Sequence, residues 1–261
     1  MKVALVQHDI VWEDAAATRE HVRPMIAKAA ADGARVIVLA EMFATGFSMQ
    51  PERIAEDEGG PSEQFLVEQA AEHDAYLIAS LAQRGTDGGY RNNAIVAAPD
   101  GRVQRYAKIH PFGFAGEDKH YTAGDRFLTV DIDSLRMSVF VCYDLRFADE
   151  FWALADRTDV YVVVANWPEP RREHWQVLLR ARAIENQAYV IGVNRVGAVK
   201  DLMHVGDSAV IDPLGRVIAQ SPPGESVVTA DIDTATVSHT RSTLPFLRDR
   251  RAGTRTTTSS T

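Results

Sequence analysis

Three residues that together could perform nucleophilic chemistry stand at the ends of predicted β-strands. Glu41 and Cys142 each follow an apolar run directly, at residues 35–40 and 137–141, and Lys108 closes a third run. Catalytic groups often lie at the carboxyl ends of strands, where loops form a cleft on a rigid sheet. Charged residues also end strands for purely structural reasons, so the argument depends on the three as a set.

The set is chemically coherent for attack of a thiol on a carbonyl group. A cysteine with a pKa of about 8.5 is mostly protonated at neutral pH and needs a base or a nearby cation. Glu41 could take the proton from Cys142 and later give it to the leaving group. Lys108 could stabilise the negative oxygen of a tetrahedral intermediate, and the backbone N–H of Tyr143 could supply a second donor. These roles predict a cysteine hydrolase of small amides.

Glu117, in the loop 113–117, is a fourth candidate. It could hydrogen-bond Lys108 or position the substrate amide, and the alternative is a solvated loop acid. His110 and His120 flank the same loop and are weaker candidates. The eight histidines show no paired metal spacing, and the single cysteine excludes zinc ribbons and Cys-x-x-Cys redox pairs. We therefore expect neither a metal nor a cofactor.

Competing catalytic classes lack their motifs, and the composition narrows the partners. There is no G-x-S-x-G elbow, Walker loop or H-E-x-x-H sequence. The formal net charge of −8, without a basic stripe, argues against nucleic acid. No apolar run approaches the roughly 18 residues that span a bilayer, and the amino-terminal segment turns polar too early for a secretory signal. A cytoplasmic protein that acts on a small molecule is expected.

The elements that must position these residues are short β-branched runs mixed with helices. Asp-Gly at 100–101 and the segment 212–215 indicate hairpins, Asp32-Gly33 a helix end, and Ser62 a helix N-cap. Strands are predicted at 2–6, 35–40, 76–82, 93–98, 102–106, 127–132, 137–142, 160–165, 189–194, 208–211, 216–220 and 226–231, and helices at 14–31, 62–73, 149–155 and 173–186.

This mixture of connections favours an α/β protein with a two-layered sheet structure covered by helices. No linker, repeat or low-complexity block interrupts the chain before its end. One domain is expected over residues 1–253, followed by a disordered Thr/Ser-rich tail at 254–261.

Several segments, taken in order, resemble the nitrilase, or carbon–nitrogen hydrolase, superfamily. The resemblance extends from about residue 2 to 232. Its motifs are Leu-Ala-Glu-Met-Phe at 39–43, Thr-Gly-Phe-Ser-Met at 45–49, Tyr-Ala-Lys-Ile-His at 106–110, Val-Cys-Tyr-Asp-Leu-Arg-Phe at 141–147, Asn-Trp-Pro at 166–168, Ala-Arg-Ala-Ile-Glu-Asn-Gln at 181–187, Asn-Arg-Val-Gly at 194–197 and the segment 206–215.

The resemblance implies a Glu–Lys–Cys triad, which falls on Glu41, Lys108 and Cys142. It also implies a nitrilase-like α-β-β-α sandwich that dimerises into a four-layered core, so a homodimer is expected. The motifs look most like the ω-amidase branch, which hydrolyses the terminal amide of 2-oxo acids such as 2-oxoglutaramate. Pro111 and the pair Ala148-Asp149 depart from that branch, where Leu and Pro-Glu are commoner.

Substrate recognition is assigned to Arg146, Trp167 and Arg172. Arg146 lies four residues after Cys142, where its planar guanidinium could bind a substrate carboxylate; alternatively, it pairs with a neighbouring aspartate and braces the turn. Trp167 would form an apolar wall, with Arg172 as a second cation. The triad also serves N-carbamoyl amino acids, aliphatic amides or nitriles. A catalytically silent binding protein is the remaining alternative.

Overall fold

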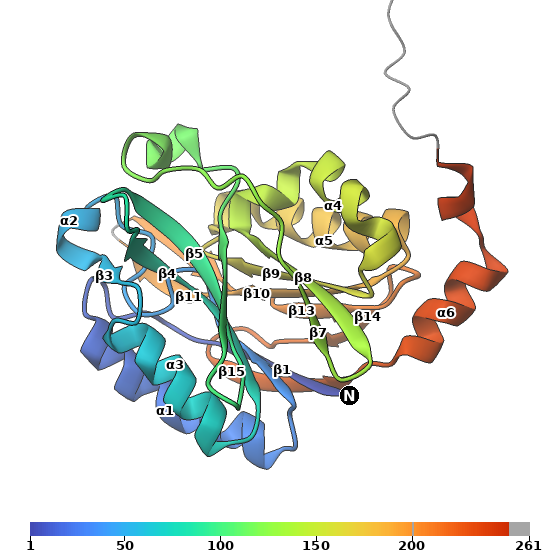
Figure 1. Cartoon of the computed structure of the whole chain (residues 1–261), viewed down its shortest axis with the longest axis horizontal. Coiled ribbons are helices and arrows are strands. Elements are labelled where there is room, and N and C mark those ends of the chain that lie inside the picture. The colour runs from blue at the N-terminus through green and yellow to red at the C-terminus, as the bar shows by residue number, and fades with distance from the viewer. Residues whose placement is uncertain (200, 251–261) are drawn as a thin grey trace, which may run out of the picture.

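The structure is a computed structural model that describes residues 1–199 and 201–250, and it consists of two β-sheets packed face to face (Figure 1). The first sheet has the order β15 (Ser226–Asp231), β1 (Lys2–Gln7), β2 (Val36–Val38), β4 (Tyr76–Arg84), β5 (Tyr90–Ala97) and β6 (Val103–Ala107), and β3 (Glu56–Asp57) also pairs with β4. The second has the order β14 (Val217–Gln220), β13 (Ala209–Ile211), β10 (Tyr189–Asn194), β9 (Val160–Ala165), β8 (Leu135–Val141) and β7 (Thr129–Ile132). A separate ribbon consists of β11 (Val196–Val199) and β12 (Leu202–Val205).

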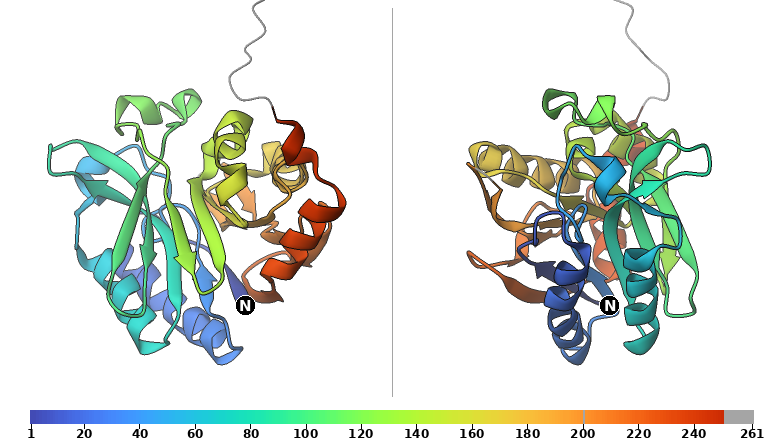
Figure 2. Two further views of the ribbon diagram at one scale, coloured as in Figure 1. Left: turned by 45° about the vertical axis from the view of Figure 1, so that its right-hand side comes forward. Right: turned by 90° about the vertical axis from the view of Figure 1, so that its left-hand side faces the viewer.

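Helices cover the outer faces of the two sheets, as the two views of Figure 2 also show. The α-helices are α1 (Ala15–Ala31), α2 (Pro51–Ile54), α3 (Pro61–Glu72), α4 (Ala148–Leu154), α5 (Arg172–Asn186) and α6 (Thr234–Thr243). The 3₁₀ turns are η1 (Gly113–Ala115), η2 (Glu117–Lys119), η3 (Cys142–Arg146), η4 (Ala155–Arg157), η5 (Glu169–Arg171) and η6 (Phe246–Asp249). No helix among the described residues combines the length and apolar character needed to span a membrane.

Strand β1 illustrates why the molecule is layered. Its side chains alternate between the two faces of the sheet. Val3 and Leu5 join the core between the sheets, whereas Ala4 and Val6 join the core under helices α1 and α3. A strand buried on both faces is apolar at consecutive positions. The result is the α-β-β-α sandwich that the resemblance implies.

Strand direction brings the predicted site residues to one edge. In the first sheet, β2 is parallel to β4, and β6 has the same direction because β5 is antiparallel to both of its neighbours. In the second sheet, β8, β9 and β10 are parallel. Residues that follow β2, β6, β8 and β9 therefore emerge from the carboxyl ends of strands that run in the same direction within each sheet.

Most elements lie near their predicted positions, with one correction and several additions. Asp32 ends helix α1, and Gly33 has φ +87°, as the helix-end signal predicts. Ser62 is not an N-cap: helix α3 begins at Pro61, and the Ser62 side chain instead hydrogen-bonds Glu56. Helices α2 and α6 and the ribbon β11–β12 were not predicted from the sequence. The predicted tail at 254–261 lies outside the described residues.

Candidate active site

Cys142 is presented by a sharp turn at the end of β8. Its φ is +46°, in the left-handed region that costs a non-glycine residue about 1 kcal/mol or more, and it begins the 3₁₀ turn η3. Cys142 is half-buried as a residue, and it lines a cavity. Strain of this kind persists where the surrounding structure fixes it, and here the turn is fixed by Asp144.

The Asp144 carboxylate accepts three hydrogen bonds around the base of this turn. The donors are the Tyr106 hydroxyl at 2.8 Å and the backbone N–H groups of His110 at 2.9 Å and Val141 at 3.0 Å. Asp144 is completely buried, and burial raises its pKa to about 6 despite these donors and the charge of Lys108. Asp144 therefore joins the strand that precedes Cys142 to the segment that follows Lys108. Asp144 lies within the Cys-Tyr-Asp motif, but its role in holding this turn was not predicted from the sequence.

Lys108 is held between two buried carboxylates. Its Nζ lies 2.9 Å from Glu41 Oε1 and 2.8 Å from Glu117 Oε2, and all three side chains are at most 1% exposed. Asn92 Nδ2 donates to both acids, at 2.8 Å to Glu41 and 3.1 Å to Glu117. The backbone N–H of Asn166 donates to the other oxygen of Glu41 at 2.8 Å. Every oxygen of the two acids thus has a donor, as buried charges require.

The electrostatics of this cluster favour a charged lysine and a protonated thiol. Burial by itself lowers the pKa of Lys108, but the charges of Glu117 and Glu41 outweigh it, and the net shift is upward. Burial raises the pKa of the Cys142 thiol, the Glu41 charge raises it further, and Lys108 opposes them. A protonated thiol needs a base during attack. Glu41 is the acid with the strongest electrostatic effect on Cys142.

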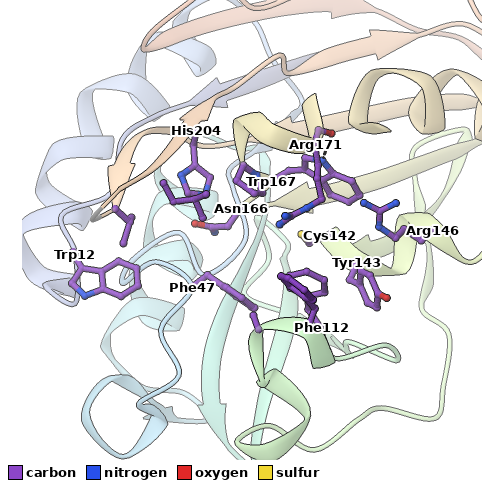
Figure 3. A pocket seen from close by; sticks show the side chains of 15 residues that line it. Trp12, Phe47, Phe112, Cys142, Tyr143, Arg146, Asn166, Trp167, Arg171 and His204 are labelled. Carbon is purple, nitrogen blue, oxygen red and sulfur yellow. Dashed lines mark hydrogen bonds between the residues drawn. The ribbon is translucent and has the colours of Figure 1, made fainter. Parts of the chain in front are cut away.

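The cavity beside Cys142 has a volume of about 270 Å³ and a mainly apolar wall that includes several aromatic rings (Figure 3). Its lining comprises Trp12, Phe47, Phe112, Phe114, Ala115, Cys142, Tyr143, Arg146, Asn166, Trp167, Pro168, Arg171, Val199, Leu202 and His204. This volume suits a small ligand. Among residues 1–199 and 201–250, no three His, Cys, Asp or Glu side chains are arranged to hold a metal ion.

The structure brings most of the predicted substrate-binding residues to this cavity. The Arg146 guanidinium lies 4.8 Å above the Trp167 ring and 3.1 Å from His174 Nδ1. Arg172 lies elsewhere: its guanidinium binds both oxygens of Asp207, at 2.6 and 2.8 Å. Arg171, the residue before it, lines the cavity instead. Sequence reasoning missed Arg171 because the two neighbouring arginines differ only in the direction of their side chains.

The remaining candidates lie at the edge of the site. His110 stacks on Phe147 with ring centroids 3.6 Å apart and lies 3.0 Å from Glu150, and it does not line the cavity. His120 is exposed and lines a different surface hollow. Tyr143 lines the cavity directly after the thiol. The geometry thus gathers a thiol, a lysine and two carboxylates beside a small aromatic pocket, an arrangement suited to acyl transfer.

The α-β-β-α sandwich and the thiol beside a buried carboxylate–lysine cluster define a class of hydrolases. Comparison with known proteins identifies the family. The carbon–nitrogen hydrolase family model matches residues 2–242, so the chain belongs to that family, and it is an amidohydrolase. It is 38% identical over 252 residues to omega-amidase YafV from Yersinia enterocolitica, covering 95% of this chain and 96% of that protein. It is 34% identical to 2-oxoglutaramate amidase from Bacillus subtilis, covering 84% and 85%. The crystal structure of XC1258 from Xanthomonas campestris, a CN-hydrolase superfamily protein, superposes with a TM-score of 0.92 at 36% identity, with 97% of each chain covered.

Proposed function

We propose that this protein hydrolyses the terminal amide of a small 2-oxo acid amide, such as 2-oxoglutaramate, to the acid and ammonia. The observation that carries the proposal is the position of Cys142 beside a buried Glu41–Lys108–Glu117 cluster and at the wall of a small pocket. The names of the relatives, omega-amidase and 2-oxoglutaramate amidase, support the choice of substrate.

In the proposed mechanism, Glu41 removes the thiol proton as Cys142 Sγ attacks the amide carbon. The carbonyl π electrons move to oxygen, and Lys108 Nζ and the Tyr143 N–H stabilise the resulting oxyanion. The intermediate collapses, the C–N bond breaks, and Glu41 returns its proton to the departing ammonia. A thioester to Cys142 remains.

The second half of the reaction uses the same groups. Glu41 removes a proton from water, and the oxygen of that water attacks the thioester carbon. Lys108 and Tyr143 again stabilise the oxyanion, and collapse breaks the C–S bond. Proton return from Glu41 restores the Cys142 thiol and releases the acid. Glu117 keeps Lys108 charged and oriented throughout, because it accepts a hydrogen bond from the same ammonium group.

A carboxylate on the substrate is expected to meet Arg146. This guanidinium lines the cavity and has no ion pair with Asp144 or Asp149. Asp144 is instead saturated by Tyr106 and two backbone donors. Arg146 is thus available to bind an anion, with the Trp167 ring below its guanidinium plane.

Ammonia release from a panel of compounds tests the proposal. The panel contains 2-oxoglutaramate, pentanamide as a neutral amide of the same chain length, an N-carbamoyl amino acid and a short aliphatic nitrile. The 2-oxo acid amide should give the highest kcat/KM, and intact mass should show an acyl adduct on Cys142 during turnover. A higher kcat/KM for any other compound would reject the substrate, and turnover by a protein without Cys142 would reject the mechanism.

A further inference from the structure

The charged side chains that line the active-site cavity are all positive among the described residues. Among the described residues that line it, two are arginines, Arg146 and Arg171, and none is an aspartate or glutamate. The nearby acids Glu41 and Glu117 are already bound to Lys108. An apolar cavity with two guanidinium groups is notable in a chain whose formal net charge is −8. Such a cavity favours an anionic ligand.

Arg171 and its neighbour Arg172 make different contacts. Arg172 makes a two-pronged ion pair with Asp207. For Arg171, no carboxylate of the described residues lies within ion-pairing distance, and its guanidinium instead lies 5.3 Å above the Phe112 ring. Figure 3 shows its side chain pointing into the cavity. Its charge is therefore uncompensated in the absence of a ligand.

The backbone around Arg171 is held in place by the cavity wall. The Trp167 indole N–H donates to the Arg171 carbonyl at 2.7 Å, and the Arg171 N–H donates to the Pro168 carbonyl at 3.1 Å. The side chain thus starts from a fixed turn, η5, between strand β9 and helix α5. Because its backbone is already fixed, Arg171 loses less conformational entropy when it binds a ligand than a residue on a mobile loop would.

Burial makes this charge costly and an anion favourable. Loss of water lowers the pKa of Arg171, and the positive charge of Arg146 lowers it further. Only a negative charge opposes them, as the Cys142 thiolate would when it forms. A guanidinium nevertheless stays protonated in proteins. An unpaired charge in apolar surroundings is stabilised strongly by a bound counter-charge.

We propose that Arg171 is a specificity-determining residue whose guanidinium, together with that of Arg146, binds the carboxylate of an anionic amide while the scissile carbonyl lies at Cys142. This assignment rests on the proposed amidase function. It adds a specificity determinant to that function, because it identifies the residue that favours substrates with an acidic acyl group over those with a neutral one.

Kinetics with two amides of equal length test the assignment. Glutaramate carries a carboxylate at the far end of the chain, and pentanamide carries a methyl group there. Arg171→Met should lower kcat/KM for glutaramate by roughly ten- to a hundredfold, the usual loss for a hydrogen-bonded charge, and leave pentanamide within about twofold. Arg126→Gln removes an equal charge from an exposed side chain and should change neither. Equal losses on both amides would overturn the assignment.

Alkylation of the single cysteine gives a second measurement that does not depend on turnover. The Cys142 thiolate displaces iodide from either iodoacetate, an anion, or iodoacetamide, which is neutral. The ratio of the two rates should fall by roughly fivefold or more in Arg171→Met, since a nearby positive charge attracts only the anion. Arg171→Lys, which keeps the charge but not the planar fork, should preserve this ratio while losing activity on glutaramate. An unchanged ratio in Arg171→Met would also overturn the assignment.

The two experiments separate failure of this inference from failure of the proposed function. If the wild-type protein released ammonia from neither glutaramate nor 2-oxoglutaramate, the proposed function would fail, and the alkylation ratio would still decide the role of Arg171. If the wild-type protein preferred glutaramate and Arg171→Met kept that preference, the function would stand and Arg171 would be excluded.

Discussion

Replacing Glu117 by Gln removes one negative charge from the buried cluster and keeps the size of the side chain. In the native protein, three donors point at this carboxylate: Lys108 Nζ at 2.8 Å, Asn92 Nδ2 at 3.1 Å and the backbone N–H of Phe112. An amide has one oxygen and one NH₂ group, so it cannot accept from all three. With its oxygen facing Lys108 and Phe112, its NH₂ group faces the NH₂ group of Asn92.

The expected losses of stability and activity follow from the number of donors that the side chain in Glu117→Gln could not satisfy, which is at least one. A buried donor left without an acceptor costs roughly 1–3 kcal/mol. For a domain of this size, that corresponds to a melting temperature lower by about 2–12 °C. A loss of similar size in transition-state stabilisation would lower kcat/KM by roughly ten- to a hundredfold. Because the Glu117 charge raises the pKa of Cys142, the thiol should also become more acidic in Glu117→Gln.

Three measurements check this expectation: ammonia release, thermal unfolding, and the pH dependence of Cys142 alkylation by iodoacetamide. Turnover should fall while the alkylation profile moves to lower pH, so the variant would have a more acidic thiol and a slower reaction. Asp118→Asn is the matched control, because it removes the same charge from the next, exposed residue. Native turnover in Glu117→Gln would show that Glu117 does not act on Lys108 during catalysis.

Four further predictions concern the site, the assembly and stability. Cys142→Ala should abolish turnover and stay folded, and Lys108→Met alone should lower kcat at least roughly a hundredfold. Adding Lys108→Met to Cys142→Ala should lower the residual rate little further, and additive losses of rate in kinetic assays would contradict this. Arg146→Lys should lose more kcat/KM on 2-oxoglutaramate than on pentanamide, and equal losses would make Arg146 scaffolding. Sedimentation at micromolar concentration should give a homodimer, and a lone 28.8 kDa species would reject it. Burial lowers the pKa of His8 to about 4, so the unfolded chain binds its proton first as pH falls below about 6.5. Stability to urea should therefore drop by about 2 kcal/mol from this group between pH 7 and 5; His8→Gln should flatten the slope, and exposed His239→Gln should not.

The positions of Glu41 and Cys142 at strand ends could be predicted because each follows an apolar run that is visible in the sequence. The strand before Lys108 could be predicted from the Asp-Gly hairpin signal at 100–101. The contacts among these three residues could not. Asn92 and Asn166 reach Glu41 across 51 and 125 residues of chain, and no local pattern encodes such distances.

The direction of a single side chain could not be predicted from the local sequence either. Arg171 and Arg172 are chemically identical neighbours. Only the turn η5 and the position of Asp207 determine that Arg171 lines the cavity while Arg172 forms a structural ion pair. The ribbon β11–β12 was missed because the sequence between Val199 and Leu202 contains no Asn-Gly or Asp-Gly pair. Helix α6 has mixed composition, and its burial of Val237 follows from packing rather than from an evident sequence period.

The two walls of the cavity differ in how freely their residues can be substituted. Phe112 lines the cavity and also donates its backbone N–H to Glu117, so a rearrangement of that segment would disturb the charged cluster. The opposite wall includes Val199, Leu202 and His204 from a two-stranded ribbon outside both main sheets. Selection for a new acyl group, in nature or in the laboratory, should therefore accumulate substitutions in the ribbon, where the shape of the pocket can change while the reaction machinery is inherited intact.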